Sequence, residues 1–209
     1  MQRPNFLIID DFLANPYDVR QQALTLNYDP KFKKGNYPGL LSTTPLPVEA
    51  LEQTVSNIIR TPVSAAPHTS HGHCRLTMSG DKGRSGVHID PCFYSGILYL
   101  SLPEHCRGGT DFFRHRRTGL EAVPATQLDL VKTGYKDRNA LIEDVINKDT
   151  TQASKWERTM RAPMRFNRLI LFSPWMFHNA GPAFGKTAET GRLVCLLFFA
   201  TKTPPKTLS

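Results

Sequence analysis

The sequence predicts a mainly β fold with flanking helices, arranged as a jelly roll or a similar barrel sandwich. Two observations predict it. Short aromatic and β-branched runs, separated by Gly- and Pro-rich turns, recur from about residue 70 to residue 200, whereas helical periodicity dominates before residue 65. The chain has 209 residues, which suits one domain spanning 1–209. We expect a helical N-terminal part at about 1–65, a barrel at about 70–200 and an insertion at about 121–161.

The N-terminal part is predicted to hold one strand and two helices. Phe6–Ile9 is a short apolar run typical of a strand. Asn15 is a candidate N-cap before a helix over Pro16–Leu26, because proline is favoured at the first helical position. Asp29–Pro47 is rich in Pro, Gly, Lys and Asn and is predicted to be a loop. A second amphipathic helix is expected over Pro47–Arg60.

The barrel part contains a series of extended segments that are rich in aromatic and β-branched residues. They are His73–Met78, Gly86–Ile89, Phe93–Leu102, Gly109–Arg114, Phe166–Ser173 and Arg192–Ala200. The more polar insertion is predicted to hold helices around Asn139–Ile146 and Ala153–Met160. An insertion of this length beside a barrel mouth could act as a lid.

Composition sets limits on location and partners. The net charge of +8 permits a nucleic-acid partner, but the basic residues are spread along the chain, and no basic stripe alternates with aromatics. The 4 cysteines form no C-x-x-C pair and no disulfide framework. The apolar stretch near the N-terminus is too short for a signal peptide, and no run is long enough for a membrane span. We therefore expect a cytoplasmic protein with no membrane partner and a small-molecule substrate; nucleic acid is disfavoured but stays open.

Three residues are candidates for a metal site. His88 and Asp90 end an extended segment, and residues i and i+2 of a strand point to the same face, so the imidazole and the carboxylate can converge on one ion. His178 follows another strand-like run. Two histidines and one carboxylate form the facial triad of non-haem Fe(II) oxygenases. Three protein ligands leave room on the iron for a bidentate 2-oxo acid and for oxygen.

Arg192 opens the strand that follows His178. Its guanidinium could bind the distal carboxylate of 2-oxoglutarate through two parallel hydrogen bonds. An ion pair at a strand edge would be the simpler role for a lone arginine. The presence of the triad favours the co-substrate role.

Taken together, these motifs resemble the Fe(II)/2-oxoglutarate-dependent dioxygenase superfamily, and in particular its prolyl 4-hydroxylase-like branch. The resemblance covers about Leu76 to Ala200 and rests on His88-Ile89-Asp90, Tyr99-Leu100, Gly108-Gly109-Thr110, His178 and Arg192. It implies a double-stranded β-helix with Fe(II) at its mouth. It also implies that 2-oxoglutarate and O2 are co-substrates, and that succinate formation is coupled to oxidation of a substrate. Because Asp90 is present, no ligand position is open for a halide, so hydroxylation is the expected outcome. Desaturation or cyclisation would use the same ligands.

Further residues are candidates for contacts with the co-substrate or substrate. Tyr94 and Tyr99 are an odd number of residues apart on one predicted strand, so at most one of them should point inward. Thr110 could line the pocket after the Gly-Gly turn. One arginine among Arg75, Arg114 and Arg168 could meet a substrate carboxylate, although surface charge explains each one more simply.

Three functions compete. The first is hydroxylation of a small polar metabolite such as an amino acid or a derivative. The second is oxidation of a macromolecule, either a protein side chain or a nucleic-acid base. The third is a non-catalytic, cupin-like binding protein, against which the complete triad together with Arg192 argues.

Overall fold

Two antiparallel sheets form the body of the protein. The computed structural model describes residues 4–32 and 37–202. The larger sheet has the strand order β1-β8-β5-β10-β4-β2, and β3 also pairs with β10. Its strands are β1 (Phe6–Ile9), β2 (Leu40–Pro45), β3 (Val63–Ala65), β4 (His73–Thr77), β5 (Tyr94–Tyr99), β8 (Leu169–Phe172) and β10 (Arg192–Thr201).

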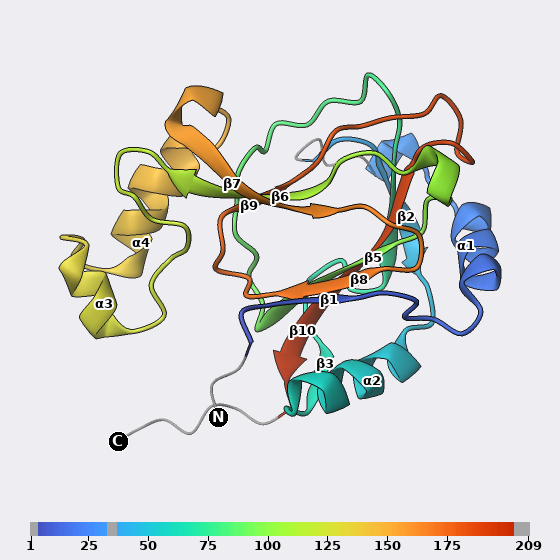
Figure 1. The fold of residues 1–209 in the computed structure, drawn as a ribbon, viewed down its shortest axis with the longest axis horizontal. Coiled ribbons are helices and arrows are strands. Elements are labelled where there is room, and N and C mark those ends of the chain that lie inside the picture. Colours follow the sequence, from blue (N-terminus) through green and yellow to red (C-terminus); the bar gives the residue numbers. More distant parts are fainter. Residues whose placement is uncertain (1–3, 33–36, 203–209) are drawn as a thin grey trace.

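The smaller sheet lies over one face of the larger one (Figure 1). It has the order β7-β6-β9, with β6 (Gly109–His115) between β7 (Trp156–Pro163) and β9 (His178–Ala180). Phe112 of β6 packs against Phe172 of β8 with ring centroids 5.2 Å apart, which joins the two sheets in one apolar core. This arrangement is the mainly β jelly roll that the strand pattern predicts.

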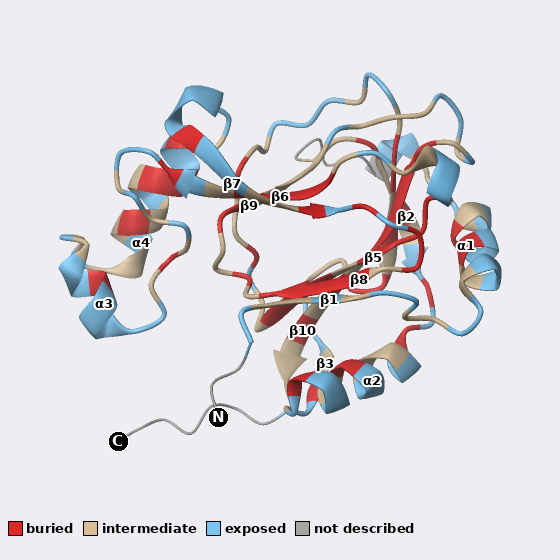
Figure 2. Ribbon diagram, in the orientation of Figure 1, coloured by how far each residue is buried: buried red, intermediate tan, exposed pale blue. Residues whose placement is uncertain are grey.

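Two helices cover the outer face of the larger sheet. They are α1 (Pro16–Thr25) and α2 (Glu49–Ile59), and their buried residues Ala23, Val55 and Ile59 join the core cluster of that face. Pro16 occupies the start of α1 as predicted, but the Asn15 side chain makes no capping hydrogen bond. Figure 2 shows the buried residues gathered on the sheets and on the inner sides of these helices. The inner face of the larger sheet therefore stays available for a site.

The structure corrects two predictions of secondary structure. Part of the predicted loop Asp29–Pro47 is the strand β2, which pairs with β4 at the end of the sheet. Prolines are tolerated there because an edge strand needs fewer of its N–H groups. The helix predicted over Ala153–Met160 is wrong: a single 3-10 turn, η4 (Ala153–Lys155), precedes β7, whose pairing with β6 decides the conformation.

The insertion packs around a small apolar cluster of its own. It contains α3 (Gln127–Lys132), α4 (Arg138–Leu141) and a π-helical segment, η3 (Ile142–Asn147), so the helix predicted around Asn139–Ile146 is present. Figure 1 shows these helices beside the smaller sheet, at its β7 end. No helix in the described part of the chain is both long and apolar enough to cross a membrane.

Candidate active site

A backbone bridge brings the two histidines together. The His88 N–H donates to the His178 carbonyl at 2.9 Å, and the His178 N–H donates to the His88 carbonyl at 3.0 Å. The segment Gly86–Ile89, predicted to be extended, forms this isolated bridge and no strand. The two imidazole rings lie with their centroids 4.4 Å apart.

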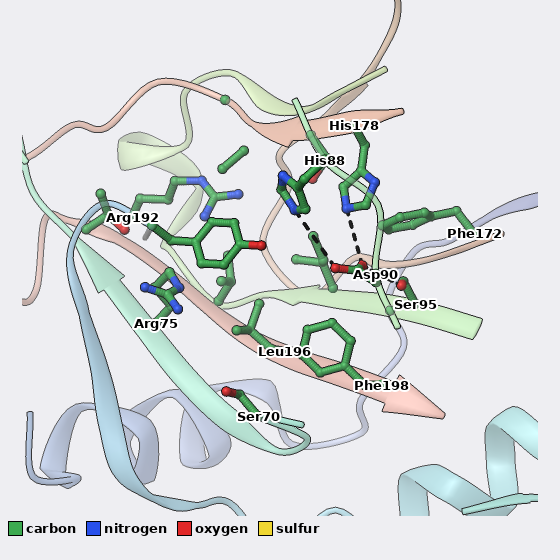
Figure 3. A pocket seen from close by; sticks show the side chains of 18 of the residues that line it. Ser70, Arg75, His88, Asp90, Ser95, Phe172, His178, Arg192, Leu196 and Phe198 are labelled. Atoms are coloured by element: carbon green, nitrogen blue, oxygen red, sulfur yellow. Dashed lines mark hydrogen bonds and ion pairs between the residues drawn. The ribbon is translucent and has the colours of Figure 1, made fainter. Parts of the chain in front are cut away.

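Asp90 completes a compact set of ligand atoms. Its Oδ1 lies 3.9 Å from His88 Nε2, and its Oδ2 lies 3.3 Å from His178 Nε2. One ligand atom from each residue lies within 4.8 Å of the other two, and Figure 3 shows all three side chains converging. The structure thus brings the three predicted metal ligands together in a geometry that one metal ion could bridge.

Hydrogen bonds hold both imidazoles in the orientation that a metal ligand needs. His88 Nδ1 lies 2.9 Å from the Gly86 carbonyl, and His178 Nδ1 lies 2.8 Å from the Met176 carbonyl. A carbonyl can only accept, so each Nδ1 carries the proton. Each neutral ring therefore keeps its lone pair on Nε2, the atom that faces Asp90.

The protonation of the site suits a cation. Burial, reinforced by the neighbouring His178, lowers the pKa of His88 to about 4. Burial alone would raise the pKa of Asp90, but His178, His88 and Ser95 together lower it to about 2. Near neutral pH His88 is therefore neutral and Asp90 ionised, which are the forms that bind a metal.

Ser95 orients the Asp90 carboxylate. The Ser95 hydroxyl donates to Asp90 Oδ2 at 2.6 Å and is itself buried. Cys92 lies nearby, with its Sγ 3.3 Å from Ser95 Oγ, and burial raises the pKa of this thiol to about 12. Sequence reasoning missed Ser95, although its shared strand face with Tyr99 was a signal that could have identified it.

A cavity of about 110 Å³ lies beside the triad, between the two sheets. Arg192 lines it and is 2% exposed. Among the described residues, its side chain makes one hydrogen bond, a long one of 3.4 Å from Nη2 to the Gly109 carbonyl, and its Nε has no partner there. Burial lowers the pKa of Arg192. A buried guanidinium with unused donors is suited to a carboxylate ligand.

The Gly-Gly turn shapes the cavity wall near Arg192. Gly109 has a φ of +154°, and a Cβ there would collide with the carbonyl oxygen of Ala162 on the paired strand β7. A glycine is therefore needed for β6 to approach β7 and to present its carbonyl to Arg192.

Of the other predicted ligand-contacting residues, Thr110 lines the cavity and the two tyrosines do not. Thr110 lines the cavity, and its Oγ1 lies 2.7 Å from the Tyr99 hydroxyl. Tyr99 is fully buried behind Thr110 and does not line the cavity itself. Tyr94 points the other way, packs in the core under the helices and donates its hydroxyl proton to the Pro4 carbonyl. It lies outside the cavity, which agrees with the expectation that at most one tyrosine faces inward.

One of the three arginines proposed for a substrate carboxylate also faces the cavity. Arg75 lines it, whereas Arg114 pairs with Glu121 and Arg168 pairs with Asp10 on the surface. Tyr37 lies between Arg75 and the triad. The Arg75 guanidinium sits 5.3 Å from the centroid of the Tyr37 ring, which in turn lies 4.9 Å from the His88 ring.

Comparisons with known proteins agree with this fold. The chain belongs to the family of unknown function DUF6445, whose profile matches residues 1–199. No match was found among curated proteins.

Among solved structures, HygX from Streptomyces hygroscopicus with nickel and 2-oxoglutarate bound is similar, with a TM-score of 0.50 and 13% identity over 95% of this chain and 83% of that chain. IDO from Bacillus thuringiensis has a TM-score of 0.46 and 12% identity over 95% and 94% of the two chains. The Fe(II)/α-ketoglutarate-dependent dioxygenase TqaL has a TM-score of 0.45 and 13% identity over 97% and 84%. At such low identity the likeness to HygX shows the fold.

Proposed function

We propose that this protein is an Fe(II)- and 2-oxoglutarate-dependent oxygenase of the prolyl 4-hydroxylase-like branch. His88, Asp90 and His178 would hold the iron, and Arg192 would bind the distal carboxylate of 2-oxoglutarate. The observation that carries the proposal is the shared cavity, which is lined both by the triad and by a buried guanidinium whose Nε has no partner among the described residues. The 2-oxoglutarate and nickel bound in HygX, which has a similar fold, support it.

The donor set fits the metal. Two neutral imidazoles and one ionised carboxylate are the ligands of non-haem Fe(II) sites, and they leave coordination positions open. Neither His88 nor Asp90 needs to lose a proton for Fe(II) to bind near neutral pH, because their lowered pKa values leave both deprotonated there.

The residues around the metal would divide the remaining tasks. Bound iron and 2-oxoglutarate supply oxidising power through the conversion of 2-oxoglutarate and O2 to succinate and CO2. Arg192 would fix the co-substrate at its far carboxylate, and Ser95 would keep Asp90 in its orientation. Phe172, whose ring packs 4.7 Å from that of His178, would limit the access of water to that side of the site. Thr110, held by Tyr99, supplies a polar wall.

We further propose that the reaction is the hydroxylation of a small polar metabolite in the cytoplasm. A cavity of about 110 Å³ is suited to small molecules. Halogenation would need the carboxylate position of the triad to be vacant so that a halide could bind the metal. Asp90 occupies that position, which favours hydroxylation. All four cysteines are free, as expected in a reducing compartment.

Succinate formation tests the proposal. Purified protein supplied with Fe(II), 2-oxoglutarate and O2 should form succinate slowly on its own and faster with a metabolite extract. Mass spectrometry of the extract should reveal a product heavier by one oxygen atom. Asp90→Ala and His88→Ala should abolish both signals, whereas the matched surface variant Asp18→Ala should not. A wild-type protein that binds no iron and forms no more succinate than Asp90→Ala would contradict the proposal and favour a non-catalytic binding protein.

A further inference from the structure

A second arginine faces the cavity beside Arg192. In the register of β4 and β10, Thr77 lies opposite Arg192 and Arg75 lies opposite Val194. Arg75 and Arg192 are therefore diagonal neighbours on one sheet face, within reach of a common ligand region. Figure 3 shows both guanidinium groups directed into the cavity.

Arg75 has no carboxylate partner among the described residues. Its polar contact is a hydrogen bond of 3.4 Å from NH1 to the Pro38 carbonyl, and its guanidinium stacks on Tyr37. Burial lowers the pKa of Arg75 to about 10, so the group is still a cation near neutral pH. An enclosed cation that meets only a carbonyl and a ring keeps most of its donors for a ligand.

In the proposed complex, the positive charge of Arg75 has no negative charge to balance it. This step rests on the proposed function. The two positive charges of Fe(II) balance the two negative charges of the 2-oxoglutarate carboxylates, and the positive charge of Arg192 balances the negative charge of Asp90. Within residues 4–32 and 37–202, the only other charged side chain that lines the cavity is Arg75. One uncompensated positive charge remains, and a substrate with one negative charge would neutralise it.

Arg75 also lies closer to the metal along the sheet than Arg192 does. Ser95, which contacts Asp90, lies opposite Phe198, so Phe198 marks the metal end of β10. Arg75 is level with Val194, two residues nearer to that end than Arg192, which corresponds to roughly 7 Å along a strand. An anion held there would lie to the side of the co-substrate and within a small molecule's length of the triad.

We propose that Arg75 binds a carboxylate of the primary substrate, and that the substrate is a small organic acid. Tyr37 and Ser70, which also line the cavity, would contact the rest of that molecule. Two alternative roles for Arg75 predict different binding results: sharing the distal carboxylate of 2-oxoglutarate with Arg192, and anchoring Tyr37 and Pro38 without binding a ligand.

Binding experiments separate these roles. The probes are straight-chain monocarboxylic acids of three to six carbons and the twenty L-amino acids. Each acid is compared with its primary amide, which lacks the negative charge. They are titrated into Ni(II)-loaded protein saturated with 2-oxoglutarate, and binding is measured by thermal shift and calorimetry. The variants are Arg75→Gln, which keeps a donor for Pro38 without the charge, Arg75→Lys, which keeps the charge, and Arg192→Gln.

At least one acid should bind more tightly than its amide. Arg75→Gln should lower the affinity for that acid by roughly 30-fold or more, and Arg75→Lys should recover part of this loss. Both variants should bind 2-oxoglutarate within about threefold of the wild-type affinity. Equal binding of acids and amides, including no binding of either, would overturn the inference. So would a loss of 2-oxoglutarate affinity in Arg75→Gln as large as in Arg192→Gln. If the wild type binds no 2-oxoglutarate, or Arg192→Gln binds it equally well, the proposed function itself fails.

Discussion

Replacing Arg192 by methionine should change the stability of the ligand-free protein and the affinity for 2-oxoglutarate in opposite directions. In the wild type Arg192 is 2% exposed, and its Nε has no partner among the described residues. An unsatisfied buried donor costs about 1–3 kcal/mol, and methionine of similar length removes it. The free energy of unfolding without ligand should therefore rise by about 1–3 kcal/mol. The midpoint of thermal unfolding should rise by roughly 2–4 °C for each kcal/mol.

The same substitution should remove most of the binding of 2-oxoglutarate. Loss of one partner of a buried charged pair costs about 2–5 kcal/mol. The dissociation constant should therefore rise by roughly 30-fold to several thousand-fold. Denaturant unfolding without ligand and calorimetry on the Ni(II)-loaded protein measure the two effects. Arg116→Met, at an exposed position, is the matched control and should change neither quantity. A variant that binds 2-oxoglutarate within about threefold of the wild type would refute the role given to Arg192.

Three further perturbations test neighbouring parts of the site. Ser95→Ala removes the 2.6 Å hydrogen bond to Asp90 and should weaken Ni(II) binding by roughly 10- to 100-fold in a chelator competition; unchanged affinity would show that Asp90 orients itself. Thr110→Val should lower the free energy of unfolding by about 1–3 kcal/mol because the Tyr99 hydroxyl loses its 2.7 Å partner, and adding Tyr99→Phe should recover most of that loss in urea unfolding. The folded-state pKa of His88 is about 4, below its ordinary value of 6.5, so the unfolded chain binds more protons between these values. Metal-free protein should therefore lose about 3 kcal/mol of stability as the pH falls through this window, and a His88→Gln variant with the same pH slope would contradict this assignment.

The candidate metal ligands could be identified from sequence because their residue types and the spacing of the first two are local features of the chain. His88 and Asp90 share a face through their spacing alone, and His178 follows a recognisable strand. What brings them together is a backbone bridge between residues far apart in the chain, which local patterns do not encode. Their convergence could be inferred only through the resemblance to a known superfamily.

The residues around the triad could be predicted only in part. From the sequence, Arg75 is one of three candidate arginines, and Ser95 is not identified. The register of β4, β5 and β10 and the contact of Ser95 with Asp90 distinguish these two residues from the alternatives. Tyr37 belongs to a Pro- and Gly-rich stretch predicted to be loop, and its ring contact with His88 joins residues far apart in the chain. The strand β7 was missed because its conformation is determined by pairing with β6 and not by its own sequence pattern.

A crystal structure of the protein grown without oxygen, with Fe(II) and 2-oxoglutarate, tests the central claim most directly. Anomalous scattering at the iron edge should locate one ion bound by His88, Asp90 and His178. The distal carboxylate of 2-oxoglutarate should accept hydrogen bonds from Arg192. An ion elsewhere, an empty triad at saturating Fe(II), or a co-substrate that does not contact Arg192 would contradict it.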